Sequence, residues 1–527
     1  LVTYDAPNLL TSSPDVSVKV NGVDLFVYET RVNHQRVWSW ANPDTMTQLV
    51  TFDFEGTVHL EVTINRDVTI ESAVLRPLVY GVAPTIEGKT ISFDLEYSGN
   101  YVLEYNDDPT TALQIFANPL EEDPITKEEA DADPNIIYVG PGLYDAGAIP
   151  TKAGATVYLA GGAYVYGSIR AEGIDGLTIR GRGIISGSIY TRNSDADYTI
   201  PVVLRSCKNI YMEGITFLDP AGWVTAIYNC DNVKIENLKM ITARSNGDGI
   251  SVQGSRNVNV SGGYVRSWDD ALVVKNVDRY STNGVHFDNV VVWSDLAQCM
   301  EVGYETYGAT MNDISFKNIT VVHAFHKAVI SCHNSDDAQI TNLTYENITV
   351  EDAQMLGDDR NDGENDFFID FTIAYNQDWT KSEGVRGSID GVTIKNVKVY
   401  KTLPTIISRM IGEATTSMIK NVSIEGIEIE KKAIKNVTDL GLVTNSYVSN
   451  VTCTQSNKVM GAYIQLPYKA NLNGNITKTN IDGIQQDGIL VPDFAIKKGD
   501  PTFLGTKISG TFSAAATHGG GTGPRDP

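Results

Sequence analysis

Short alternations of apolar and polar residues recur along most of this chain. Each unit is a strand-like run, then Asn or Gly, then a second run, and five consecutive units start 23, 25, 27 and 29 residues apart. Such alternation predicts strands with one buried face, and Asn or Gly supplies the turn between them. The five units are NIYMEGITF from Asn209, NVKIENLKM from Asn232, NVNVSGGYV from Asn257, GVHFDNVVV from Gly284 and DISFKNITV from Asp313.

The repeat length predicts the architecture. A period of 23 to 29 residues fits one coil of three short strands, and coils that cannot bury an apolar face alone can do so when they stack. We therefore expect an all-β fold whose main domain, residues 135–510, is a right-handed parallel β-helix. An all-β sandwich is the competing architecture, but it would not repeat so regularly. A 48-residue step from Leu343 to Gly391 contains the polar segment 357–366, which predicts a loop inserted into one coil.

The two ends of the chain have other patterns. Residues 1–118 contain longer alternating strands separated by turn signals, which predicts an N-terminal β-sandwich. Residues 119–134 are acidic and contain proline, so we interpret them as a linker. Residues 511–527 are rich in glycine, which predicts a flexible tail.

Composition and charge narrow the function classes. Of the 527 residues, 42% are apolar, so the chain can bury a large core. The net charge of −24 disfavours nucleic acid as a partner, and also polyanionic sugars unless the binding groove carries cations. The five cysteines are scattered, odd in number and without CxxC spacing, which predicts neither a zinc site nor a disulfide scaffold.

The sequence also lacks the signals of cofactor and membrane proteins. It contains no nucleotide-binding loop and no metal-binding His pair, so we expect no cofactor and no metal. It contains no run of 18 apolar residues, so we expect no membrane span. The first residues do not form a signal peptide, which we expect to be absent or removed.

Three aspartates form the main candidate for chemistry. Asp248 in SNGDGISV and Asp269 in SWDDALVVK are 21 residues apart, about one coil, and Asp270 follows directly. Positions one coil apart stack at about 4.8 Å, so the three carboxylates should share one patch. Aspartates are common in ordinary turns, but gathering three like charges costs free energy and indicates a functional site. Calcium is a less suitable explanation, because the flanking residues are apolar or aromatic and offer few oxygen ligands.

Close carboxylates have the chemistry that glycoside hydrolysis requires. Their mutual repulsion pushes their pKa values apart, so one stays protonated and can donate while the others stay anionic and can activate water. Hydrolysis of a glycosidic bond uses one group of each kind.

The motifs NGDGI and WDDALVVK, on a repeat of the N-V-x-I-x-N type, resemble a known clan of enzymes. It is the β-helical glycoside hydrolase clan of polygalacturonases (family 28) and of dextranases and isopullulanases (family 49). The resemblance spans about 350 residues of the repeat pattern. It implies a polysaccharide hydrolase that inverts the anomeric centre, with Asp269 as general acid and with Asp248 and Asp270 holding the attacking water.

The two families imply different substrates. Polygalacturonases carry Gly-His-Gly about one coil after the aspartate pair and then Arg-Ile-Lys, whereas this chain has LAQCMEVGYE and no Arg-x-Lys. An N-terminal β-sandwich before the β-helix is typical of the dextranase-like family. These features and the acidic charge favour a neutral α-glucan such as dextran or pullulan. The 21-residue aspartate spacing is closer to the polygalacturonase pattern, so a pectic or other plant or microbial polysaccharide is the alternative.

Further residues near the aspartates are candidates for sugar binding. Aromatic side chains can stack on sugar rings, although packing is the commoner role of a lone aromatic, and polar side chains can contact hydroxyls. Asn246, two residues before Asp248, can orient it. The full set is Asn246, Trp268, Lys275, Trp293, Gln298, Glu301, Tyr304, His326 and Lys327.

Two other readings stay open. A non-catalytic β-helix would bind glycans without releasing product. A polysaccharide lyase shares the fold but needs a base, a cation and usually calcium, and no Arg or Lys stands directly beside the aspartates. We expect a polysaccharide or oligosaccharide as the partner, a monomer, and secretion to the extracellular space or periplasm, because a polymeric substrate lies outside the cell.

Overall fold

A computed structural model describes residues 1–34, 43–190, 200–357, 366–402 and 406–462, and two short strands at 484–486 and 489–491. The predicted tail 511–527 and residues 358–365 of the predicted inserted loop lie outside these described residues. Within the described part, no helix is long and apolar enough to cross a membrane. All five cysteines are free, and four of them are buried.

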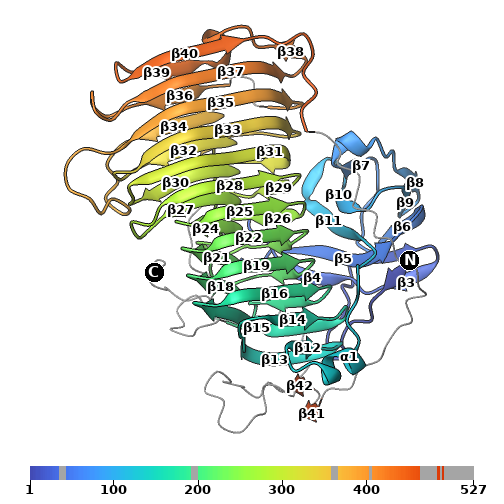
Figure 1. Ribbon diagram of the computed structural model, residues 1–527. Helices are drawn as coiled ribbons and strands as arrows, with labels where there is room; N and C mark the ends of the chain where they lie inside the picture. Colours follow the sequence, from blue (N-terminus) through green and yellow to red (C-terminus); the bar gives the residue numbers. More distant parts are fainter. Residues whose placement is uncertain are drawn as a thin grey trace.

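The main domain is a stack of β-coils, which confirms the predicted parallel β-helix. Equivalent strands of successive coils pair in parallel, and the coils run from β12 at one end to β40 at the other (Figure 1). Each coil contributes to three faces. The first face contains β12 (Ile136–Val139), β14 (Ala155–Leu159), β16 (Asp175–Gly181), β19 (Lys208–Glu213), β22 (Asp231–Glu236), β25 (Arg256–Ser261), β28 (Thr282–Asp288), β31 (Thr310–Ala324), β33 (Gln339–Val350), β35 (Ser388–Val399), β37 (Ile419–Ile429) and β40 (Val448–Thr454).

The second and third faces complete each coil. The second face contains β13 (Gly142–Ile149), β15 (Ala163–Glu172), β17 (Ile184–Ser186), β20 (Thr216–Leu218), β23 (Lys239–Ile241), β26 (Tyr264–Ser267) and β29 (Val291–Ser294), and the long strand β31 continues onto it. The third face contains β18 (Val202–Arg205), β21 (Thr225–Tyr228), β24 (Ile250–Gln253), β27 (Leu272–Asn276), β30 (Met300–Thr306), β32 (Ile330–Asn334), β34 (Ile369–Ile373), β36 (Ser408–Ile411) and β39 (Leu442–Thr444).

The alternating pattern produces the core directly. Because side chains of a strand alternate between its two sides, every second residue points into the coil. On the third face one inward row crosses eight coils, and none of its side chains is exposed. The row is Leu204, Ile227, Val252, Val274, Val302, Cys332, Phe371 and Met410.

The turns between strands follow the predicted Asn chemistry. Asn318, Asn347 and Asn396 all have left-handed backbone conformations, with φ of 52°, 58° and 56°. Their side chains stack in a ladder, in which Asn347 Nδ2 donates to Asn318 Oδ1 at 3.1 Å and Asn396 Nδ2 donates to Asn347 Oδ1 at 2.7 Å. The ladder satisfies amide groups that the turns would otherwise leave without partners.

The N-terminal region is a β-sandwich, as predicted. One sheet contains β1 (Val2–Thr3), β4 (Tyr28–Arg31), β5 (Met46–Phe54), β7 (Ala73–Arg76), β10 (Gly99–Tyr105) and β11 (Asp108–Pro119). The other contains β2 (Val16–Val20), β3 (Val23–Leu25), β6 (Val58–Ile64), β8 (Thr85–Glu87) and β9 (Thr90–Leu95). A short helix, α1 (Lys127–Ala132), lies between the last sandwich strand and β12.

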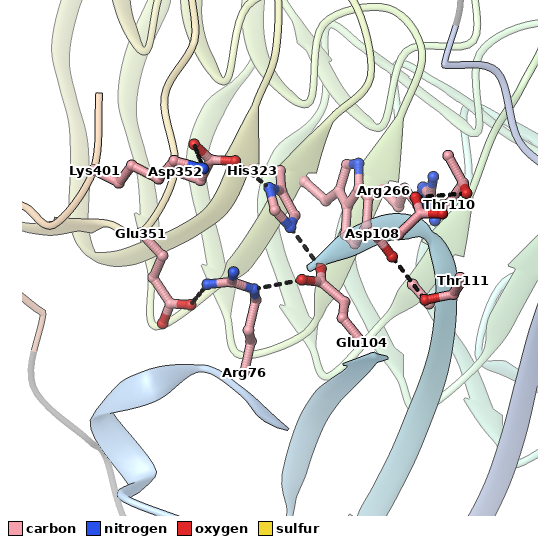
Figure 2. Close-up of polar contacts among 12 residues, drawn as sticks. Arg76, Glu104, Asp108, Thr110, Thr111, Arg266, His323, Glu351, Asp352 and Lys401 are labelled. Atoms are coloured by element: carbon pink, nitrogen blue, oxygen red, sulfur yellow. Dashed lines mark hydrogen bonds and ion pairs between the residues drawn. The ribbon is translucent and has the colours of Figure 1, made fainter. Parts of the chain in front are cut away.

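The sandwich packs on the second face of the β-helix (Figure 1). Phe116 and Leu49 of the sandwich join one apolar cluster with Tyr264 and Trp293 of the β-helix. Buried charges reinforce this interface. Figure 2 shows His323 between Asp352 and Glu104, with nitrogen–oxygen distances of 3.1 and 2.5 Å, and Arg76 between Glu104 and Glu351, at 3.0 and 2.9 Å. The two domains therefore meet through a large contact that is both apolar and ionic.

Candidate active site

The three predicted aspartates lie together at one edge of the third face. Asp248 comes two residues before β24, and Asp270 comes two residues before β27 in the next coil. The Gly249 amide donates to Asp270 O at 2.9 Å, which places Asp248 beside Asp270. Asp248, Asp269 and Asp270 are 1%, 8% and 5% exposed. The coil spacing therefore brings three nearly buried carboxyl groups into one patch.

The turns that carry these carboxyl groups are held by backbone contacts. The Thr242 hydroxyl donates to Gly247 O at 2.6 Å and accepts from the Trp268 amide at 3.0 Å, so it joins two successive turns. Gly249 is required by the close stacking of the coils, because a Cβ there would lie 2.4 Å from Ala271 O. The coils thus meet too closely at this edge for any other residue.

Backbone amides orient the aspartate pair. Asp269 accepts a hydrogen bond from the Asp270 amide at 3.0 Å, and the Asn246 amide also donates to it. Asp270 accepts from the Gln298 amide of the following coil at 3.2 Å. Asn246 reaches this position through a left-handed backbone conformation, with φ of 55°.

The aspartate pair holds protons more tightly than exposed carboxyl groups do. Burial raises the pKa of Asp269, while the charges of Lys275 and Lys327 oppose the rise. Burial also raises the pKa of Asp270 well above its ordinary value, and the neighbouring Asp269 raises it further. Two carboxyl groups this close cannot both ionise easily, so the pair keeps a proton at pH values at which an exposed aspartate is charged.

Asp248 has a different environment, because a lysine lies against it. Lys275 Nζ is 3.0 Å from Asp248 Oδ2 and 3.4 Å from Glu305 Oε2, and it lies 4.7 Å from the centre of the Trp223 ring. Burial alone would lower the pKa of Lys275, but Asp248 and Glu305 raise it well above its ordinary value. The ammonium group therefore stays charged and stabilises the anionic form of Asp248.

A chain of four charged side chains continues from the aspartates across the next coils. His333 Nδ1 is 3.0 Å from Glu301 Oε1, and His333 Nε2 is 3.1 Å from Asp370 Oδ2. The Arg409 guanidinium donates two hydrogen bonds to the Asp370 carboxylate, of 2.7 and 2.9 Å. The Tyr304 ring stacks on His333 at 4.2 Å between centres, and Gln298 Nε2 lies 3.4 Å from the Tyr304 hydroxyl.

Three more of the predicted sugar-binding residues are Lys327, which lies near the aspartates, and His326 and Trp268, which are buried. The charge of Lys327 acts on Asp269 and on Asp366, so this half-buried lysine belongs to the cluster. His326 precedes it, is 6% exposed and has its ring 6.4 Å from that of Phe325. Trp268 is fully buried and offers no face to a sugar.

Trp293 lies elsewhere, which corrects its placement among the sugar-binding residues. Its ring packs under the sandwich, 3.9 Å from the Arg266 guanidinium and 4.4 Å from the His323 ring. Its indole nitrogen donates to Asp295 Oδ1 at 2.9 Å. The reason is its strand: β29 is on the second face, which the sandwich covers.

Sequence reasoning missed several members of the cluster. They are Trp223, Glu305, His333, Asp366, Asp370 and Arg409. Asp370 and Arg409 continue an outward row that starts at Ser251 and passes through Glu301 and Ser331. Counting coils onward from the aspartates would have found Ser331 and His333, but the longer step that follows them hides Asp370.

Two further observations concern metal ions and cavities. No set of three or more His, Cys, Asp or Glu is arranged to hold a metal ion among the residues that the structure describes. A cavity between the two domains is lined by Tyr80, Asn118, Arg180 and Tyr211, among others, and none of the three aspartates lines it.

The chain is similar to known proteins. Residues 162–453 match the family model "Glycosyl hydrolases family 28". Two proteins of Arabidopsis thaliana described as "Probable polygalacturonase" are 24% identical over 186 residues and 26% identical over 127 residues. These matches cover 34% and 22% of this chain, and only 40% and 29% of the two relatives.

The solved structure of Dex49A from Penicillium minioluteum has a similar fold. Its TM-score is 0.52 at 16% sequence identity, with 86% of this chain and 96% of that chain covered. This likeness concerns the fold alone. The family model covers more than half of the sequence and includes all three aspartates, so this chain belongs to the glycosyl hydrolases of family 28 and is a glycoside hydrolase.

Proposed function

We propose that this enzyme hydrolyses a polysaccharide with inversion of the anomeric centre, with Asp269 as general acid. Asp269 donates a proton to the glycosidic oxygen as the bond to the anomeric carbon breaks. Asp248 and Asp270 hold a water molecule and direct its oxygen to the opposite side of the sugar, and Asp248, which lies beside Lys275, takes up the proton of the water. The products are a shortened chain and a new reducing end.

One observation carries this proposal: the site holds carboxyl groups in two protonation environments. The buried pair Asp269 and Asp270 has raised pKa values, whereas Lys275 lies 3.0 Å from Asp248. The pair therefore supplies the acid and Asp248 supplies the base. Asp269 is the least buried of the three, at 8% exposure, which suits the group that must reach the leaving oxygen.

The substrate we propose is a polysaccharide of the pectic type, so that the enzyme is polygalacturonase-like. The family match and the two plant relatives support this choice over the neutral α-glucan that the sequence favoured. An α-glucan is the second candidate, because the chain carries a net charge of −24 and a sandwich before its β-helix. Because either substrate is a polymer found outside cells, we infer that the protein acts after secretion. We also propose that it acts as a monomer.

The test is release of reducing sugar, with product sizing, from polygalacturonate, pectin, dextran and pullulan. We expect release from a pectic polymer and its loss in Asp269→Asn, while Asp313→Asn, on the first face, keeps full activity. Proton NMR of the first product should show the inverted anomer. An ultraviolet-absorbing product would indicate a lyase, and binding without any product would indicate a glycan-binding module; both would contradict the proposal.

A further inference from the structure

Two of the cations near the aspartates, Lys275 and His333, are already matched by carboxylates of the protein. Lys275 contacts Asp248 and Glu305, at 3.0 and 3.4 Å. His333 lies between Glu301 and Asp370, at 3.0 and 3.1 Å. A carboxylate on a bound sugar would have to compete with these contacts for positive charge.

The four-residue chain Glu301, His333, Asp370 and Arg409 is balanced in charge. Burial lowers the pKa of His333, but Glu301 and Asp370 outweigh burial and raise it to about 10, so the imidazole is positive at neutral pH. Burial raises the pKa of Asp370, but His333 and Arg409 outweigh burial and hold it well below its usual range. Two positive and two negative groups therefore face each other, and little net charge reaches the substrate.

An uncharged surface covers His333, in the middle of this chain. The Tyr304 ring stacks on His333 with an angle of 10° between the planes, and His333 is left 3% exposed. Beside the ring, Gln298 Nε2 approaches the Tyr304 hydroxyl at 3.4 Å. A phenol and an amide suit sugar rings and hydroxyl groups, since both can stack or exchange hydrogen bonds without a charge.

Nearer the aspartates, the local charge is negative. Asp248, Glu305 and Asp366 are acidic, and the pair Asp269 and Asp270 adds one further negative charge when it holds one proton. Lys275 and Lys327, together with Arg409 of the charge-balanced chain, are the cations whose charges act on this group among the described residues. The excess of acid disfavours another carboxylate in the same place, and burial reduces screening by solvent.

We propose that the sugar bound between the catalytic aspartates and Tyr304 carries no free carboxylate, so that it is a neutral or esterified residue. The charge-balanced chain beneath Tyr304 and the acidic excess around Asp269 select for it. This inference rests on the proposed function only for the position of the substrate. It deepens that function, because esterified or carboxyl-reduced pectic chains satisfy it and free polygalacturonate does not.

The experiment compares three forms of one backbone. Oligogalacturonide, its methyl ester and its carboxyl-reduced form have the same linkage and differ only at the carboxyl group. Binding is measured by calorimetry with Asp269→Asn, so that no hydrolysis intervenes. We expect the ester and the reduced form to bind at least ~10-fold more tightly than the acid, about 1.4 kcal/mol. Equal binding, tighter binding of the acid, or binding of none of the three overturns the inference.

A second set of variants tests the cause. Asp370→Asn keeps the shape of the side chain and removes one compensating charge, so binding of the acid should improve relative to the ester by several-fold. Glu305→Gln should act in the same direction and serves if Asp370→Asn does not fold. Glu346→Gln, on the first face, should change nothing. Unchanged selectivity in a folded Asp370→Asn or Glu305→Gln overturns the inference, whereas selective binding without hydrolysis by the wild type would overturn the proposed function alone.

Discussion

The ammonium group of Lys275 lies 3.0 Å from the carboxylate of Asp248, on adjacent coils of the third face. Both side chains are almost completely buried. Burial disfavours the charged form of a carboxyl group, and a cation in contact with it favours that form. We therefore expect Lys275 to act as a positioning residue that favours the anionic form of Asp248.

Replacing Lys275 by methionine tests this relationship. Lys275→Met keeps the length of the side chain and removes its charge, so Asp248 should take up a proton more readily. We expect kcat to fall by about 10²-fold, the usual contribution of a general base, and the acid limb of the pH profile of kcat/KM to move to higher pH. Lys275→Arg should recover part of the activity.

Lys317→Met provides the matched control, because Lys317 is exposed on the first face and contacts only Glu346 among the ion pairs described, at 3.4 Å. It should retain wild-type rates. A Lys275→Met enzyme that folds, keeps its acid limb and loses less than ~3-fold in kcat would show that the contact has no role in the reaction.

The charge of Lys327 should set the alkaline limit of activity. Lys327 and Lys275 lower the pKa of Asp269 against the rise that burial causes. Removing Lys327 therefore raises this pKa further, and a general acid with a higher pKa stays protonated to higher pH. We expect the alkaline limb of kcat/KM in Lys327→Met to shift upwards, with the acid limb unchanged. A downward shift would mean that Asp269 is not the proton donor.

Much of the fold could be predicted because the coil repeats its pattern. Val252, Val274 and Val302 form one row on the third face, and their side chains point into the coil. A period-two pattern predicts that orientation without tertiary information. The placement of Asp248 beside Asp270 follows from the same periodicity. Positions one coil apart meet, whatever the side chains are.

The rest of the site depends on which face a strand joins and on what covers that face. Trp293 belongs to β29 on the second face, and the sandwich buries it, which no local pattern in β29 indicates. Asp370 follows a step of the repeat that is longer than one coil, so counting from His333 gives the wrong residue. Long-range packing and irregular steps are the two things that the repeat does not encode.

The sandwich should support catalysis by holding the turn before Asp248. Asn33 Nδ2 donates to Ala243 O at 3.2 Å, and Arg31 contacts Asp219, which also binds Arg244 at 3.0 Å. Asn33→Ala removes one buried hydrogen bond, about 1 kcal/mol of stability, and lets the turn shift. We expect kcat to fall about 10-fold, with KM little changed, because small displacements of a catalytic group are costly.

The comparison for Asn33→Ala is Lys19→Ala, an exposed change on the outer sheet of the sandwich. Steady-state kinetics and the melting temperature of both variants separate the two effects. If Asn33→Ala lowers the melting temperature but leaves kcat at the wild-type value, the sandwich contributes stability only.

Glu121, in the segment between the domains, should make stability depend on pH. The side chain is 5% exposed and accepts a hydrogen bond from the Tyr158 hydroxyl at 2.9 Å. Burial raises its pKa to about 7.

In the unfolded chain the carboxyl group of Glu121 ionises near pH 4.5, whereas in the fold it keeps its proton until about pH 7. The unfolded state therefore binds fewer protons across this interval, and stability falls as pH rises from about 4.5 to about 7. The full effect is at most about 3.5 kcal/mol, since one pKa unit corresponds to about 1.4 kcal/mol. Glu121→Gln cannot ionise and still accepts the hydrogen bond from Tyr158, so its melting temperature should fall less than that of the wild type over this range.

Glu122→Gln, at the exposed neighbouring position, should follow the wild type. Melting curves at pH 4.5, 5.5 and 7 decide the matter: parallel curves for Glu121→Gln and the wild type would show that Glu121 is ionised throughout and that its burial is compensated by Arg180 and Arg182.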